Sequence, residues 1–453
     1  MPLQSRPAGR LYRFYLPMPF AIALARGLFG LAVLIGIAYL LSRDRRNISW
    51  RLVGFGLLLQ LVFAGLILGT EVGRAAFEGI GGAFVTLLSF TYEGSAFVLG
   101  PLGLAPGPDA PLFSFAFGIL PVIIFFASLT ALLYHLGALQ VIVKGLGWLM
   151  AKTLGISGAE ALSAAANVFI GQTEAPLVVK PYIARMTNSE LMTLMTGGMA
   201  TIAGSVLAAY VGFLGGPDPA QQALFAGHLL SASIMSAPAS IVVAKILVPE
   251  TGRPETLGSL ELSTEKLEAN AIEAAAAGAG EGLKLALNVG AMLLAFIAII
   301  AMINAVLGWF GGLIGLNDWI AEASSGRFDG LSLQALFGVV FAPLAWAMGV
   351  ESADILQFGR LLGEKIAINE FVAYASLGEF RETAEVSQRT LIIGAYALCG
   401  FANFSSIAIQ IGGIGGLAPT RRSDVARLGV LAVIGGALAS WMTATIAGVL
   451  IGG

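Results

Sequence analysis

The feature that most constrains this chain is a series of long apolar runs separated by short polar stretches. A membrane-spanning helix needs about 20 apolar residues, because the hydrocarbon core of a bilayer is about 30 Å thick. Eight runs reach this length, at 16–41, 52–70, 113–136, 191–214, 222–248, 283–308, 387–411 and 427–451. We therefore expect an all-α polytopic membrane protein with eight transmembrane helices, multi-pass in a cell membrane, with the lipid bilayer as its main partner.

Composition supports this class and excludes others. The 453 residues are 57% hydrophobic and only 11% charged, whereas a soluble domain carries about 25% charged residues. A formal net charge of −2 gives no reason to expect a nucleic-acid partner. The single cysteine, Cys399, excludes an intramolecular disulfide. The first apolar run is too long for a signal peptide, so we expect it to remain as a helix.

Basic residues indicate the orientation only in part. Arginines cluster between residues 43 and 51, after the first run, and between 421 and 427, before the last. Cytoplasmic loops are enriched in arginine and lysine, so both clusters favour termini outside the cell. Arg6, Arg10 and Arg13 favour the opposite orientation. Two further segments read as non-spanning: 71–98, which carries charges and could lie along the surface, and 249–282, an acidic, alanine-rich loop with some helix.

Two stretches of the chain repeat the same order of elements. Each begins with an amphipathic stretch, at 146–150 and 344–348, and continues with two apolar half-spans around a break and then two full spans. A half-span is too short to cross a bilayer, so each pair predicts a re-entrant helical hairpin. Three full spans separate the two hairpins, and this odd number makes them enter from opposite faces. The sequence thus predicts an inverted repeat with two opposed re-entrant hairpins, as in secondary transporters.

An acidic residue lies at the break of each hairpin: Glu174 in the first and Glu370 in the second. An ionisable side chain at membrane depth is costly and marks a functional site. The span after each hairpin also contains a polar, small-residue interruption, at 196–205 and 399–406, where a helix can unwind only if it lines a cavity. Close packing through small residues is the alternative explanation for the first interruption.

The polar groups at these breaks indicate the kind of solute. Two carboxylates, two amides and two hydroxyls can hydrogen-bond a neutral solute rich in O–H and N–H groups, and Phe401 can supply a flat apolar face. These groups belong to Gln172, Thr173, Glu174, Glu370, Asn403 and Ser406. An anionic solute fits less well, because we expect no buried arginine or lysine at either tip. The chemistry alone predicts a polyhydroxy or heterocyclic solute.

Four motifs resemble the concentrative nucleoside transporter family. They are Gly171-Gln-Thr-Glu-Ala-Pro-Leu177, Gly204-Ser-Val206, Asn369-Glu-Phe-Val-Ala-Tyr374 and Cys399-Gly-Phe-Ala-Asn403. The motifs stand in family order, and the resemblance covers roughly residues 113–451. It implies a bacterial-type member in the inner membrane, a homotrimer, and nucleoside import coupled to Na⁺ or H⁺ without an organic cofactor.

The resemblance also implies roles for individual residues. Gln172, Thr173 and Glu174 would bind the nucleobase, with Val206 packed against it. Glu370, Asn403 and Ser406 would bind the ribose, beside Phe401. A Na⁺ site would comprise the Asn167 side chain, the Ile170 carbonyl, the Thr201 hydroxyl and the Ile202 carbonyl, all oxygen ligands that suit a hard cation.

The resemblance gives the chain a division into parts: peripheral helices over 1–112, scaffold helices at 113–136 and 283–308, and repeats over 137–248 and 331–453. The hairpin-bearing repeats would move against the scaffold in an alternating-access cycle. A proton-coupled symporter, a passive channel and an intramembrane enzyme using Glu174 and Glu370 as acid and base remain alternatives. The sequence contains no His-Glu-x-x-His zinc motif and no Walker-type loop to support an enzyme.

Overall fold

The computed structural model describes residues 19–104, 115–259 and 268–451, and every regular element in these ranges is helical. The first helices are α1 (Phe20–Leu40), α2 (Trp50–Leu68), α3 (Glu71–Leu99), α4 (Leu120–His135) and α5 (Ala138–Leu154). The basic residues Arg6, Arg10 and Arg13 lie outside the described residues, as do the first residues of the spans expected at 16–41 and 113–136 and part of the acidic segment 249–282.

The rest of the chain contains the two hairpins and their broken helices. The middle elements are α6 (Gly158–Ala166), the 3-10 helix η4 (Ala175–Val179), α7 (Lys180–Ile183), α8 (Asn188–Ala200), α9 (Gly204–Gly215), α10 (Pro219–Leu247) and α11 (Ala271–Leu313). The last elements are α12 (Leu316–Ala323), α13 (Leu333–Ala347), α14 (Ile355–Ala367), α15 (Glu370–Glu382), α16 (Gln388–Leu398), α17 (Phe404–Leu417) and α18 (Arg422–Ile451).

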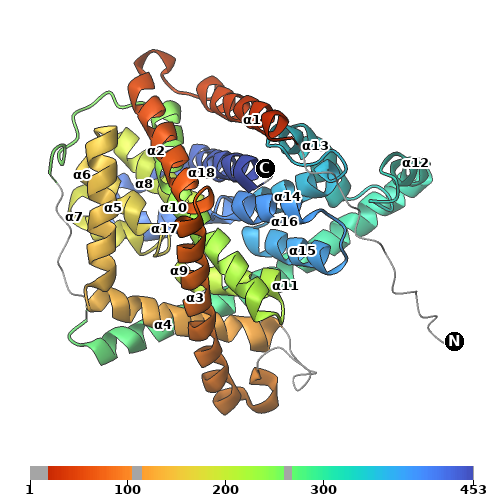
Figure 1. Cartoon of the computed structure of the whole chain (residues 1–453), viewed down its shortest axis with the longest axis horizontal. Coiled ribbons are helices and arrows are strands. Elements are labelled where there is room, and N and C mark those ends of the chain that lie inside the picture. The colour runs from red at the N-terminus through yellow and green to blue at the C-terminus, as the bar shows by residue number, and fades with distance from the viewer. Residues whose placement is uncertain (1–18, 105–114, 260–267, 452–453) are drawn as a thin grey trace.

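The core of the molecule is formed by α10 and α18, which pack against each other near its centre (Figure 1). The apolar stretches of these two helices are 89% and 83% buried, whereas that of α11 is only 11% buried. Both central helices contact α8 and α16, so the two repeats share one interior. Helix α11 packs mainly along α4 and runs across the molecule to α12 (Figure 1). An apolar helix that is so exposed faces lipid or another chain.

The helices follow the order predicted for the two repeats, except that the second arm of the first hairpin is divided into η4 and α7. The first copy runs from α5 through the hairpin of α6, η4 and α7 to the broken pair α8 and α9 and then α10. The second copy runs from α13 through the hairpin of α14 and α15 to the broken pair α16 and α17 and then α18. Both expected interruptions are real breaks, at 201–203 and 399–403, where backbone groups leave the helical ladder.

The structure differs from the sequence-based expectation at three boundaries. Residues 71–99 form one continuous helix that is long and apolar enough to cross a membrane, and they complete the set of eight such stretches in the described residues. The expected span at 387–411 is divided, so neither half reaches spanning length. The helix expected at 283–308 starts at Ala271, because the alanine-rich end of the acidic segment favours helix although it is not apolar.

Candidate functional site

The tip of the first hairpin is an irregular stretch from Asn167 to Glu174. The backbone N–H groups of Glu174 and Ala175 donate to the Gly171 carbonyl at 3.1 and 2.9 Å, which closes the turn. Gly171 leaves room for the Glu174 carboxylate, because a Cβ at this position would lie 2.5 Å from Oε2 of Glu174. Pro176 is the second residue of η4, in the first turn of a helix, where the missing N–H costs little.

Gln172 points into the molecule, while its neighbours Thr173 and Glu174 are exposed. The Nε2 of Gln172 donates to Oγ of Ser406 at 3.1 Å. Its Oε1 accepts from Nε2 of Gln410, also at 3.1 Å. Both partners belong to α17, so the tip of the first hairpin is bonded to the broken helix of the second repeat.

The tip of the second hairpin holds the carboxylate of Glu370 at the start of α15. Asn369 caps this helix by accepting from the N–H of Val372 at 3.0 Å. The hydroxyl of Tyr210 donates to Oε1 of Glu370 at 3.0 Å, and Nδ2 of Asn403 donates to Oε2 at 2.7 Å. Both oxygens of this buried carboxylate are therefore engaged by donors from α9 and from the break before α17.

These contacts join the two tips into one polar network. Asn403 caps α17, and its Oδ1 accepts from the N–H of Ser406 at 2.9 Å. Glu370, Asn403, Ser406 and Gln172 thus form a continuous series of hydrogen bonds from one hairpin to the other. The sequence named all four residues, and the structure brings them together.

The other residues named for the solute lie around this network. Thr173 rests against α17, with its Cγ2 3.7 Å from where a Cβ of Gly413 would be. Phe401 is half-buried in the break before α17. Val206 is buried in α9, one turn before Tyr210, so it shares a helix face with the residue that contacts Glu370.

Asn167 ends α6 and is almost fully buried, at 1% exposure. Its Nδ2 donates to the carbonyl of Ser163 at 2.9 Å, and because a carbonyl can only accept, this bond fixes the orientation of the amide. The Oδ1 of Asn167 then faces away, and it has no hydrogen-bond partner in the described structure. A buried acceptor without a partner costs about 1–3 kcal/mol, which a bound cation would offset.

The end of a second helix meets Asn167 at this point. Thr201 follows α8, and its Oγ1 donates to the carbonyl of Gly197 at 3.0 Å. A Cβ at Gly197 would lie 3.3 Å from Nδ2 of Asn167, so α6 and α8 end side by side. Ile170 and Ile202 are buried in the same two breaks. The carboxyl end of each helix carries a partial negative charge of about half an elementary charge, which favours a cation.

The ligands available here are neutral oxygens. Within the described residues, no group of three His, Cys, Asp or Glu side chains could hold a metal ion. Amide, hydroxyl and carbonyl oxygens suit a hard cation of low charge better than a transition metal. The Asn167, Ile170, Thr201 and Ile202 set therefore fits a sodium ion on the chemistry of its donors.

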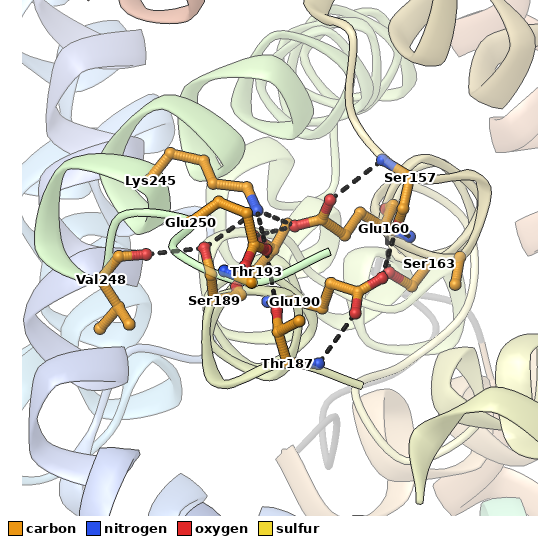
Figure 2. Close-up of polar contacts among 12 residues, drawn as sticks. Ser157, Glu160, Ser163, Thr187, Ser189, Glu190, Thr193, Lys245, Val248 and Glu250 are labelled. Carbon is orange, nitrogen blue, oxygen red and sulfur yellow. Dashed lines mark hydrogen bonds and ion pairs between the residues drawn. The ribbon is translucent and has the colours of Figure 1, made fainter. Parts of the chain in front are cut away.

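The base of the first hairpin is a separate polar cluster, which the sequence analysis did not identify. Helices α6 and α8 both begin with a capping box, in which Ser157 pairs with Glu160 and Thr187 pairs with Glu190. Ser157 also donates to Oε1 of Glu190 at 2.7 Å and so links the two helix starts. Figure 2 shows these caps arranged around one buried charge cluster.

Lys245 of α10 is the centre of this cluster (Figure 2). Its Nζ forms an ion pair with Glu160, lies 3.4 Å from Oε2 of Glu250, and donates to Oγ of Ser189 at 2.9 Å. Thr193 donates a further bond to Glu160 at 3.0 Å. Each of these buried groups has partners inside the chain, so we interpret the cluster as the anchor of the hairpin and not as a ligand site.

Three residues of the site region escaped the sequence analysis. Gln410 lies four residues after Ser406, a spacing that places both on one face of α17 and could have revealed it. Tyr210 lies within an apolar run, and the sequence alone gives no signal that distinguishes it from a core aromatic. The expectation of no buried lysine near a tip is wrong for the second hairpin: Lys365 is fully buried, and its Nζ donates to the Ala397 carbonyl and to Ser440, both at 2.8 Å. These bonds use two of the three N–H donors of the ammonium within the protein.

Family models cover most of the chain. Residues 29–102 match the N-terminal part and residues 228–448 the C-terminal part of a Na⁺-dependent nucleoside transporter model. Residues 116–217 match a model described as nucleoside recognition, and this range contains the whole first hairpin.

Individual relatives and solved structures agree with these matches. The Bacillus subtilis transporter YutK is 46% identical over 426 residues, which are 94% of this chain and 99% of that protein. The sodium/nucleoside cotransporter 1 of Rattus norvegicus is 40% identical over 435 residues, 93% of this chain and 63% of its own. The structure of CNTnw in an inward-facing substrate-bound state superposes with a TM-score of 0.84 at 42% identity, over 95% of this chain and 98% of that chain. An outward-facing variant of CNTnw reaches a TM-score of 0.85 at 41% identity, over 95% and 98% of the two chains.

Proposed function

The chain belongs to the concentrative nucleoside transporter family, whose members are membrane transporters and not enzymes, and from this premise we propose that it imports nucleosides by symport with Na⁺. The observation that carries the proposal is the hydrogen-bonded series from Glu370 to Gln172 across the two hairpin tips. A solute that replaces or extends these bonds contacts both hairpins at once, so its binding is coupled to their relative position.

In this proposal the two tips share the nucleoside between them. Gln172, Thr173 and Glu174 bind the nucleobase, with Val206 behind them, and Glu370, Asn403, Ser406 and Phe401 hold the ribose. The exposure of Thr173 and Glu174 supports the first assignment, since these residues are accessible to a solute. The carboxylate of Glu370 supports the second, because an oxygen already held by Tyr210 can accept a second bond from a ribose hydroxyl.

The sodium site is proposed at Asn167, Ile170, Thr201 and Ile202. The unpaired Oδ1 of Asn167 supports it, together with the two helix ends that lie side by side there. Asn167 lies five residues before Gln172 in the same tip, so ordering one end of the tip restricts the other. Two ligands that favour the same conformation of one segment bind cooperatively, which is the coupling a symporter needs.

We propose further that the hairpin-bearing repeats move against a scaffold of α4 and α11, with the N-terminal helices at the periphery. The long mutual contact of α4 and α11 and the exposure of α11 support this division. The large apolar surface of α11 also suits a homotrimer in which each copy keeps its own site. The bacterial origin of two relatives that match over nearly their whole length favours the inner membrane.

The proposal is tested by uptake of radiolabelled uridine into proteoliposomes, first with an inward Na⁺ gradient and then with an inward proton gradient alone. Accumulation only with Na⁺ is the expected result. Accumulation driven by protons would support the nucleoside as substrate but reject the sodium site, and coupling would then be assigned to titration of Glu174 or Glu370. Equal uptake without any gradient would indicate a passive channel, and no uptake of any nucleoside by folded protein would overturn the substrate.

A further inference from the structure

Gln410 occupies the point where three elements of the site meet. It belongs to α17, is 1% exposed, and donates from Nε2 to the carbonyl of Met195 in α8 at 3.0 Å and to Oε1 of Gln172 at 3.1 Å. Gly198 makes room for this contact, since a Cβ there would lie 2.9 Å from Cβ of Gln172 and 3.1 Å from Nε2 of Gln410. The amides of Gln172 and Gln410 are thus held together opposite Gly198, where a larger residue would not fit.

The contacts of Gln410 determine the polarity of Gln172. The carbonyl of Met195 can only accept, so the NH₂ group of Gln410 must face it. The second N–H of the same group donates to Gln172, which must therefore turn its Oε1 toward Gln410. The Nε2 of Gln172 then faces Ser406, where one of its two N–H groups is used and the other is left for a solute.

Packing alone does not explain an amide at position 410. The Oε1 of Gln410 is buried and has no hydrogen-bond partner in the described structure. An unsatisfied buried acceptor is unfavourable, and a methionine or leucine would fill the same space without it. Unlike an apolar residue, the amide of Gln410 provides two N–H donors on one nitrogen.

We propose that Gln410 is a positioning residue that fixes the amide orientation of Gln172 and thereby selects nucleosides whose base presents an acceptor to the Gln172 N–H group. This inference rests on the proposed function, because it assigns base selectivity to a residue behind the nucleobase contact. A fixed donor discriminates strongly between bases, since a base that presents its own donor there leaves two buried donors facing each other.

The test uses equilibrium binding of nucleosides to the purified full chain, by isothermal titration calorimetry, and uptake into proteoliposomes. The variants are Gln410→Met, Gln410→Glu, Gln172→Met and the double variant Gln172→Met/Gln410→Met. Gln60→Met is the matched control, because Gln60 is also fully buried, donates to Thr443 at 3.0 Å and has an unpaired Oε1, but joins α2 to α18 away from the tips.

We expect Gln410→Met to raise the Kd for uridine about tenfold, the size of a lost hydrogen bond in a buried site. The maximal uptake rate at saturating uridine should stay within about twofold of the wild-type rate, since the residue acts through binding. Gln60→Met should leave the Kd unchanged. An unchanged Kd in Gln410→Met, or an equal rise in Gln60→Met, would overturn the role of Gln410.

Two comparisons separate positioning from a general structural effect. If Gln410 acts through Gln172, the double variant binds no more weakly than Gln172→Met alone; additive losses would overturn the inference. Uridine and cytidine present opposite donors and acceptors at N3 and at the exocyclic group on C4, while both present O2 as an acceptor. In Gln410→Met, the ratio of the uridine Kd to the cytidine Kd should move toward one. In Gln410→Glu, the carboxylate would reverse the Gln172 amide, so the preference between uridine and cytidine should be inverted.

The outcome also distinguishes this inference from the function on which it rests. Wild-type protein that binds no nucleoside would overturn the proposed function and the role of Gln410 together. Wild-type binding with the same uridine-to-cytidine ratio in both Gln410 variants would overturn only the selectivity assigned to Gln410.

Discussion

The base and the tip of the first hairpin contain similar polar residues but differ in how far these residues are paired within the protein. At the base, Glu160 and Lys245 pair with each other and with surrounding hydroxyl groups. At the tip, Oδ1 of Asn167 has no partner, and Glu174 is exposed. Only the nine residues of α6 separate the two regions, a rise of about 14 Å.

This contrast shows how one short helix can serve both stability and binding. Buried polar groups are stable only when their hydrogen bonds are made, so a closed cluster resists rearrangement. An open set of polar groups is costly until a ligand completes it. The base therefore fixes where the hairpin starts, and the tip keeps polar groups available for the solute and the ion that we propose to bind there.

The largest effect should follow from breaking the base. Lys245→Met leaves Glu160 buried without its counter-charge, which should destabilise the protein by about 3–5 kcal/mol and reduce the yield of folded protein. Thermal unfolding in detergent, followed by size-exclusion chromatography, measures this. Lys284→Met is the control, because its pair with Glu281 is exposed on both sides. Wild-type stability in Lys245→Met would remove the anchor role of the cluster.

At the tip, Glu174→Ala should separate binding from stability. Loss of a charged hydrogen-bonding group in a binding site costs about 1.5–3 kcal/mol, so we expect the Kd for uridine to rise at least about tenfold and uptake to be abolished. The midpoint of thermal unfolding should stay close to wild type, because this side chain is exposed. Retained uptake would exclude Glu174 from the site, and a large drop in the midpoint would place it in the fold instead.

Asn167 gives a further test of the difference between base and tip, because its unpaired Oδ1 is buried inside the protein. Asn167→Leu removes an unsatisfied acceptor, so stability should fall by less than about 1 kcal/mol while the Na⁺ concentration for half-maximal uptake rises about tenfold or more. Asn167→Asp keeps the oxygen ligands and should retain Na⁺ dependence. Uptake by Asn167→Leu with an unaltered Na⁺ requirement would contradict the proposed ion site.

The smallest effect is expected for one bond within the closed cluster. Thr193→Val removes a single donor to Glu160 and should cost about 1 kcal/mol of stability, with uptake per folded molecule unchanged. Thr153→Val, at an exposed hydroxyl that bonds only its own helix, is the control. A loss of uptake without a loss of stability in Thr193→Val would show that the base also takes part in transport.

The sequence predicted the tip better than the base, for a physical reason. Glu370 stands out in an apolar stretch, and its neighbours at the break are polar and close in sequence. Glu160 and Lys245 are 85 positions apart, and their pairing depends on where α6 and α10 cross. Hydropathy located the apolar runs but could not predict that the acidic segment would continue into α11, because alanine is a strong helix former without being strongly apolar.

The length of α11, 43 residues, makes the position of this helix dependent on the thickness of the membrane. Such a helix is about 65 Å long, twice the roughly 30 Å of hydrocarbon in a bilayer. Its charged residues Glu273, Glu281 and Lys284 lie near the start, and the remaining part, about 42 Å over 286–313, exceeds the hydrocarbon thickness, which a helix commonly accommodates by tilting. A thicker bilayer would allow a smaller tilt of this helix from the membrane normal, and a thinner bilayer would require a larger one. Because α4 packs along α11, a change in the tilt of α11 with bilayer thickness would be passed on to α4.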